Sequence, residues 1–323
     1  SGCAIFTGSS PERHSEPTMT TLLYTHPACL EHDPGPYHPE SPARLRAVLA
    51  ALEAPELARL ERREAPEAAR DDIARVHPRR FIERMLAAVP ASGHAGIDAD
   101  TVLSPQSGRA ALRAAGAVVA AVDAVVAGEA DNAFCAVRPP GHHAEPARAM
   151  GFCLFNNVAV GACHAMAHHG IERIAIVDFD VHHGNGTEDI FRGDDRVLFC
   201  SSFQHPFYPY SSHQAATPRL VPISLPAGSG GPLFRQKISE RWLPALEAFK
   251  PELLLVSAGF DGHILDDMSD LALREADFEW VTESILRVAR RHARGRLVSV
   301  LEGGYELGAL GRSVVSHLKP MLS

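Results

Sequence analysis

Four short apolar segments of this chain each end in a cluster of side chains that bind metal ions or transfer protons. The segments are 133–137, 174–177, 253–256 and 297–301, and the clusters that follow them are Arg138–Ala144, Asp178–Gly186, Ser257–Asp267 and Glu302–Tyr305. Short segments that are mainly apolar on both faces are typical of buried parallel strands. In open α/β sheets, ligands bind beyond the carboxyl ends of such strands. The pattern therefore predicts one crevice in which these side chains meet, and it indicates a metal-dependent hydrolase.

The clearest metal-binding pattern is the pair Asp180 and His182, which are separated by one residue. On an extended segment, residues i and i+2 face the same side, so both side chains could hold one ion. A third ligand has to come from elsewhere, and Asp261, Asp266 and Asp267 all follow another predicted strand. Two carboxylates and one imidazole would leave an open position for water and substrate, as catalytic zinc requires.

Candidate proton-transfer groups stand in two of the other clusters. His142 and His143 follow the stiff sequence Arg-Pro-Pro-Gly, which would direct both imidazoles into the crevice. Histidine has a pKa suited to proton transfer at neutral pH. Tyr305 follows Gly303 and Gly304, whose missing side chains would let the backbone and the phenol approach a ligand closely.

The rest of the chain alternates predicted strands and helices. Strands are expected at 22–24, 133–137, 174–179, 196–200, 253–257 and 297–301, and helices at 42–52, 106–126, 157–168, 232–248, 275–293 and 308–321. This alternation predicts a single-domain open parallel sheet, of about eight strands, flanked by helices. Three histidines on or just beyond the helix at 157–168, namely His164, His168 and His169, are interpreted as surface or packing residues.

Residues 1–18 are expected to be a disordered or non-native extension, so that the catalytic domain spans 19–323 and Met19 lies near the natural start. The net charge of −8 and the absence of a Lys/Arg block argue against nucleic acid or a membrane as a partner. No apolar stretch is expected to reach the length of a membrane-spanning helix. The six cysteines form no Cys-x-x-Cys pair, which favours reduced thiols and a cytoplasmic location.

Five segments taken together resemble the histone deacetylase superfamily, whose members have the arginase/deacetylase fold. They are Arg138–Ala144, Gly151–Asn157, Asp178–Gly186, Ser257–Asp261 and Leu301–Tyr305. The resemblance covers about residues 20–320 with the segments in the family's order. Within these segments, Glu302 before Gly-Gly-Tyr and Asn185 after His-His-Gly resemble the residues found in the class II branch and its bacterial amidohydrolase relatives. The resemblance implies a zinc enzyme (zinc or ferrous iron in the cell) that removes an acyl group from an amine.

The resemblance also implies which residues hold the ion. Asp180 and His182 match two of the family's ligands, and Asp266 is taken as the third because it lies five residues after Asp261. The residue that follows this ligand is usually proline in the family, whereas this chain has Asp267.

The catalytic residues follow from the same resemblance. His143 matches the general base that deprotonates water and later protonates the leaving amine. His142 matches its electrostatic partner, which Asp178 orients, and Asn185 is expected to accept a hydrogen bond from His143. Tyr305 matches the hydroxyl that polarises the amide carbonyl and stabilises the oxyanion.

Two further sets of residues are implied. The walls of the substrate tunnel are expected to include Gly151, Phe152, Tyr208 and Gly304. A structural potassium site is expected at Asp178, Asp180, His182, Ser201 and Ser202.

Two rival functions share this resemblance. A binuclear manganese ureohydrolase on the same fold needs an aspartate two residues beyond His182, where this chain has Gly184. A non-catalytic reader of acetyl-lysine would have lost a ligand, a base or the tyrosine, and all are present. The expected partner is an acylated lysine or a small acylated amine such as a polyamine, and homo-oligomers are compatible with the sequence.

Overall fold

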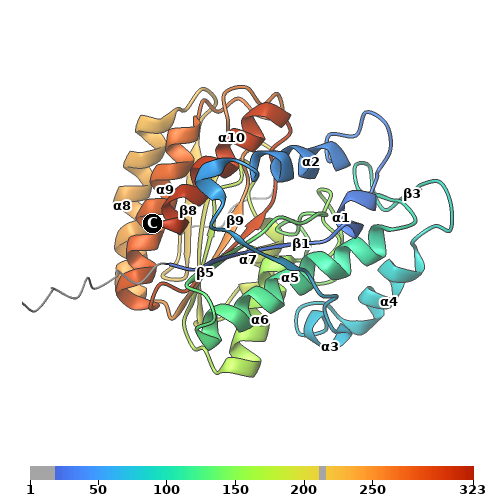
Figure 1. Cartoon of the computed structure of the whole chain (residues 1–323), viewed down its shortest axis with the longest axis horizontal. Helices are drawn as coiled ribbons and strands as arrows, with labels where there is room; N and C mark the ends of the chain where they lie inside the picture. The colour runs from blue at the N-terminus through green and yellow to red at the C-terminus, as the bar shows by residue number, and fades with distance from the viewer. Residues whose placement is uncertain (1–18, 211–215) are drawn as a thin grey trace, which may run out of the picture.

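An eight-stranded sheet runs through the centre of the computed structural model, which describes residues 19–210 and 216–323 (Figure 1). Its strands are β1 (Thr21–Thr25), β2 (Glu61–Glu64), β5 (Asn132–Cys135), β6 (Ile174–Asp178), β7 (Val197–Gln204), β8 (Leu220–Leu225), β9 (Leu253–Ala258) and β10 (Leu297–Leu301). The order is β2-β1-β5-β10-β9-β6-β7-β8, and every neighbouring pair is parallel. A separate antiparallel pair consists of β3 (Ala95–Gly96) and β4 (Val102–Leu103). The predicted parallel α/β sheet is thus confirmed, while the expected extension at 1–18 lies outside the described residues.

Helices cover both faces of the sheet (Figure 1). One layer contains α2 (Pro42–Ala51), α8 (Gly231–Phe249), α9 (Glu275–His292) and α10 (Leu307–Leu318), and the other contains α5 (Ser107–Ala127) and α6 (Asn157–His169). The remaining helices are short: α1 (Ala28–Glu31), α3 (Arg70–Ile73), α4 (Arg79–Ala87), α7 (Asn185–Phe191), and the 3₁₀ turns η1 (Pro55–Leu57) and η2 (Lys319–Leu322). Because both faces are covered, the central strands are buried along their whole length, which explains their continuous apolar sequences.

Helix α5 corrects one expectation from the sequence. Among residues 19–210 and 216–323 it is the one helix long and apolar enough to cross a membrane by length and composition, and 61% of its most apolar window is buried inside the protein. Its alanines favour the helix, and Gly128, with a φ of 76°, ends it. Gly116 fits against the backbone of residues 66–68, where an added Cβ would overlap the chain. A buried core helix accounts for these features.

The strand order explains why the predicted clusters meet. Strands β5, β10, β9 and β6 are consecutive in the centre of the sheet. Their ends are level, since Cys135 pairs with Val300, Leu301 with Ala258, and Ser257 with Asp178. Four polar segments distant in sequence therefore begin at one edge of the sheet, where open α/β sheets bind their ligands.

Candidate active site

Three side chains at the centre of this edge are placed to hold a metal ion. They are Asp180 and His182, which follow β6, and Asp261, which follows β9, and their donor atoms lie within 4.8 Å of one another. The Nδ1 atom of His182 is 3.1 Å from Asp180 Oδ1 and 3.2 Å from Asp261 Oδ2. All three side chains are buried.

The chemistry of this trio fits a divalent cation. Asp261 Oδ2 is buried and receives no hydrogen bond, although it lies near His182. Burial and the neighbouring Asp180 raise the pKa of Asp261 to about 6. Burial alone would lower the pKa of His182, but the hydrogen bond to Asp180 and the charges of both carboxylates raise it to about 9. An added Cβ on Gly259 would overlap Asp180, and one on Gly303 would overlap both carboxylates. The trio therefore attracts positive charge, and its oxygen and imidazole donors suit zinc or ferrous iron.

Asp266, the third ligand expected from the sequence, lies outside this trio, and its carboxylate is hydrogen-bonded to backbone N–H groups. Asp266 Oδ2 accepts hydrogen bonds from the backbone N–H groups of Tyr305 (2.6 Å) and Glu306 (3.0 Å), and Oδ1 accepts one from Met268. Asp261 lies three residues beyond the end of β9, still against the end of β6, whereas the chain turns away after it. Asp266 instead holds the backbone of Tyr305, and the neighbouring Asp267 is exposed.

The two adjacent histidines lie beside the trio with their ring centroids 4.0 Å apart. His142 Nδ1 is 2.9 Å from Asp178 Oδ2, which is the contact predicted for this carboxylate. Burial alone would lower the pKa of His142, but Asp178, Asp180 and Glu302 outweigh it and hold that pKa well above its usual value. Burial and the nearby cationic imidazoles of His142 and His182 hold the pKa of His143 well below its usual value.

An amide fixes the tautomer of His143. Its Nδ1 atom is 2.7 Å from Asn185 Oδ1, as the sequence predicted. The orientation of this amide is set because Asn185 Nδ2 donates to Glu145 Oε1. Since an amide oxygen only accepts hydrogen bonds, His143 must carry its proton on Nδ1 and present a lone pair on Nε2. Gly151 lies against the imidazole, and a Cβ there would overlap it.

Glu302, whose role the sequence did not reveal, braces the histidine loop. Its Oε2 atom accepts hydrogen bonds from the backbone N–H groups of Gly141 (2.7 Å) and His142 (3.3 Å), and Oε1 accepts one from Ser257. Burial raises the pKa of Glu302 to about 7. This side chain therefore links β9, β10 and the segment after β5 directly beneath the site.

A second network that the sequence analysis missed is centred on the buried carboxylate of Glu40. Arg138 donates to both of its oxygens, and Arg44 donates to Oε1. Arg44 also donates to the carbonyl oxygens of Glu302 and Gly304 and lies 4.7 Å from the centroid of the Tyr305 ring. Burial alone would raise the pKa of Glu40, but Arg138, His32 and Arg44 hold it well below its usual value. Arg138 begins the histidine loop, so the network ties that loop to the segment that carries Tyr305.

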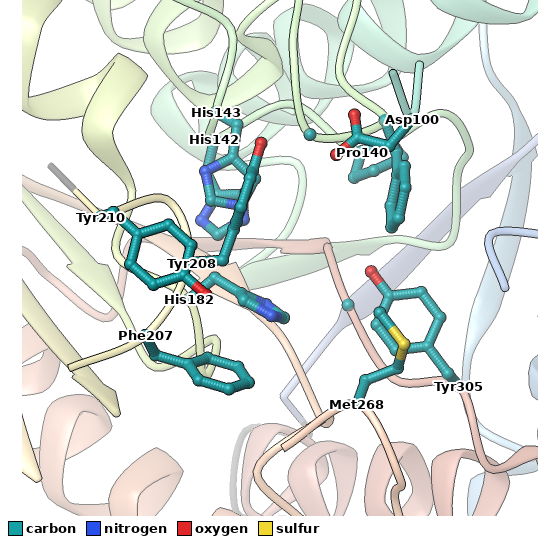
Figure 2. A pocket seen from close by; sticks show the side chains of 13 residues that line it. Asp100, Pro140, His142, His143, His182, Phe207, Tyr208, Tyr210, Met268 and Tyr305 are labelled. Carbon is teal, nitrogen blue, oxygen red and sulfur yellow. The ribbon is translucent and has the colours of Figure 1, made fainter. Parts of the chain in front are cut away.

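His182 of the trio, His142 and His143 line a cavity of about 220 Å³ (Figure 2). Figure 2 shows the Tyr305 hydroxyl directed into the same space as the imidazoles of His143 and His182. Burial, with the nearby aspartates, keeps the pKa of Tyr305 well above its usual value, so the hydroxyl remains a hydrogen-bond donor at neutral pH. Gly303 lines the cavity. Gly304, which the sequence predicted as a wall residue, accepts a hydrogen bond from Arg44 at its carbonyl oxygen.

Aromatic side chains form most of the cavity wall. Phe152 and Tyr208 line it as predicted, and Phe207 and Met268 are additional lining residues (Figure 2). Phe152 adopts a φ of 68°, and its backbone N–H donates to the hydroxyl of Thr101. The Tyr208 ring stands 5.2 Å from that of His143, and the Phe207 ring is stacked 5.5 Å from that of His182. These walls would enclose an aliphatic chain and exclude water from the histidines.

A family comparison identifies the chain. The sequence profile of the histone deacetylase domain matches residues 38–321. The chain belongs to the histone deacetylase family.

Relatives in this family are similar over most of the chain. The histone deacetylase-like amidohydrolase of Pseudomonas aeruginosa is 40% identical over 313 residues, which cover 89% of this chain and 82% of that protein. The human polyamine deacetylase HDAC10 is 35% identical over 98% of this chain and 48% of its own length. The crystal structure of the HDA15 HD domain has a TM-score of 0.88 and 31% identity, and the match covers 94% of this chain and 90% of that one.

The geometry predicts that Asp261 and Asp266 respond differently to substitution. Asp261→Ala should abolish tight metal binding at this site, because it removes one of three donors. Asp266→Ala should retain the ion and lower kcat, because it frees the backbone of Tyr305. Metal content after dialysis and turnover of the metal-loaded proteins measure the two effects. Loss of the ion from Asp266→Ala alone would contradict this expectation and confirm the assignment made from the sequence.

The Glu40 network predicts a large loss of stability on truncation. Glu40→Ala leaves two buried guanidinium groups without their carboxylate, which should lower the free energy of unfolding by about 3–5 kcal/mol. Glu53 forms an exposed ion pair with Arg62 at 2.8 Å, and Glu53→Ala should cost less than about 1 kcal/mol. Urea denaturation of both variants measures the difference, and equal effects would show that the buried network does not stabilise the fold.

Proposed function

We propose that this chain is a metal-dependent amidohydrolase that removes an acetyl or other acyl group from a lysine side chain or from a small amine such as a polyamine. Zinc or ferrous iron would be held by Asp180 and His182 together with a third carboxylate, which is Asp266 by the sequence match or Asp261 by the geometry of the trio. The observation that carries the proposal is the convergence of three side chains on one cavity, namely His182 of the trio, His143 and Tyr305.

When bound, the ion supplies Lewis acidity, which polarises the amide carbonyl and a water molecule. The chain's own groups handle the protons. His143 accepts a proton from the attacking water at Nε2, since its Nδ1–H is occupied by Asn185. The Tyr305 hydroxyl donates a hydrogen bond to the carbonyl oxygen as negative charge develops there. The C–N bond then breaks, and His143 returns its proton to the departing amine.

His142 acts as a fixed positive charge in this scheme. Asp178 holds the pKa of His142 well above its usual value and so keeps it protonated. His142 therefore cannot accept the proton of the water in place of His143. The charge also helps to keep His143 unprotonated at neutral pH, which a general base requires.

We also infer a structural monovalent cation, potassium in the cell, behind the trio. Ser201 pairs with Asp178 in the register of β6 and β7, and Ser202 is buried beside it. The Ser201 hydroxyl is also 2.9 Å from His183 Nδ1, so backbone oxygens would have to provide much of the coordination.

The binuclear alternative is disfavoured by the backbone at position 184. A second metal would need a carboxylate there, and a Cβ on Gly184 would overlap the carboxylate of Asp178.

Acetate or amine release from a panel of substrates tests the proposal. We expect the metal-loaded protein to cleave an acetyl-lysine peptide, an acetylated polyamine or a trifluoroacetyl amide. Tyr305→Phe should reduce kcat by about 10²–10³-fold, because it removes one donor to the oxyanion and no metal donor. Unchanged metal content in this variant is the control. The proposal fails if the loaded protein cleaves none of the panel or if Tyr305→Phe is fully active.

The pH dependence of the reaction should report the partner of His143. Asn185→Asp replaces a neutral acceptor with a carboxylate, which favours the imidazolium form and raises the pKa of His143. The base form is then lost at higher pH, so the acidic limb of the kcat/KM profile should move to higher pH. Profiles of both proteins on one substrate measure the shift. An acidic limb that stays in place would show that His143 is not the group whose ionisation it reports.

A further inference from the structure

A second cluster of metal-binding side chains lies on the outer helices, away from the sheet edge. It brings together Asp72 of α3, Asp123 of α5 and His164, His168 and His169 of α6. These are the histidines that the sequence indicated as surface or packing residues. In the structure His164 is buried and both of its ring nitrogens face carboxylates.

His164 is the centre of the cluster. Its Nε2 atom is 2.7 Å from Asp123 Oδ1, and His169 Nε2 is 2.6 Å from the same oxygen. Its Nδ1 atom is 3.0 Å from Asp72 Oδ1. A metal-bound histidine typically donates its other ring N–H to a carboxylate, which fixes the tautomer and the ring. Asp72 stands in that relation to His164, so the Nε2 side is the one prepared for an ion.

His168, the remaining histidine of the cluster, is paired with an arginine. Arg75 donates to His168 Nε2 at 2.9 Å and also lies 3.7 Å from Asp72. His168 therefore uses its lone pair on a guanidinium, whereas the donor atoms of Asp123, His164 and His169 face one another.

We propose that Asp123, His164 and His169 form a second site for a borderline transition-metal ion, with zinc, nickel and copper as the fitting class. Two imidazoles and one carboxylate are usual donors for such ions, and a water molecule completes four-coordination. Ligand atoms around a tetrahedral zinc lie about 3.4 Å apart, so the three donors have to separate slightly. Asp123 and His169 have side-chain exposures of 50% and 24%, which leaves them room to do so.

Occupation of this site would join α5 and α6 directly and α3 through Asp72. Helix α6 starts at Asn156 and Asn157, whose side chains donate to the carbonyls of Ala144 and Pro139 in the histidine loop. The ion would thus stabilise the helix that supports this loop from its far end, while contributing no group to the reaction.

Zinc stoichiometry of the intact chain tests the site. The wild-type protein should hold one zinc ion more than His169→Ala and Asp123→Ala at saturating micromolar zinc, and both variants should keep their turnover. His168→Ala is the matched control on the same helix end and should keep the extra ion. The count is a difference between variants, so it does not depend on whether an ion binds at Asp180 and His182.

Two further measurements sharpen the result. Asp72→Asn should weaken zinc binding at this site about 10–100-fold without lowering the stoichiometry at saturation. Zinc should raise Tm less in His169→Ala than in the wild type, since an ion that binds only the folded chain stabilises it. Equal stoichiometry in the wild type and His169→Ala would overturn the proposal and leave the cluster as ion pairs only. Loss of the ion from His168→Ala would also overturn it, because the site would then lie on the Asp72 side.

Discussion

Buried negative charge is the constraint on which the site and its surroundings depend. Five carboxylates, namely Glu40, Asp178, Asp180, Asp261 and Glu302, are no more than 1% exposed and lie close to one edge of the sheet. An unpaired buried charge costs several kcal/mol, so each of them requires a cation or hydrogen-bond donors. Arginines neutralise Glu40, a histidine neutralises Asp178, and backbone N–H groups hold Glu302. Asp180 accepts hydrogen bonds from His182 and Gly303, whereas Asp261 Oδ2 has no hydrogen-bond partner, and a divalent ion beside it would supply the missing positive charge.

The same constraint links the first part of the chain to the last. Glu40 precedes α2, and its two arginines reach the ends of β5 and β10. The position of Tyr305 is consequently fixed from two sides, by Arg44 against its ring and by Asp266 at its backbone N–H. Because these contacts are charged and buried, the phenol is held in place before substrate arrives, and preorganised donors of this kind are the most effective in catalysis.

Sequence patterns predicted the centre of the fold better than its edges. The central strands are buried on both faces, so their apolar sequences identify them. Strand β2 is Glu-Arg-Arg-Glu and β8 contains Pro222, and neither was expected because edge strands tolerate charge and proline. Within the site, motifs predicted the contacts of His142 and His143. The motif count predicted Asp266 as the third ligand, whereas Asp261 is the carboxylate that lies with Asp180 and His182 in the structure, because counting along a loop does not show where the chain turns.

The two histidines show how neighbouring residues of one type acquire different roles. They are adjacent in sequence and almost equally buried, so exposure to solvent does not distinguish them. Asp178 gives His142 a charged hydrogen-bond acceptor, whereas Asn185 gives His143 a neutral one. The first histidine stays cationic, and its charge then lowers the pKa of the second, which reinforces the difference. A pair of titrating groups separated in this way can hold a fixed positive charge and a free base within one small cavity. That combination is what hydrolysis of a neutral amide at neutral pH requires.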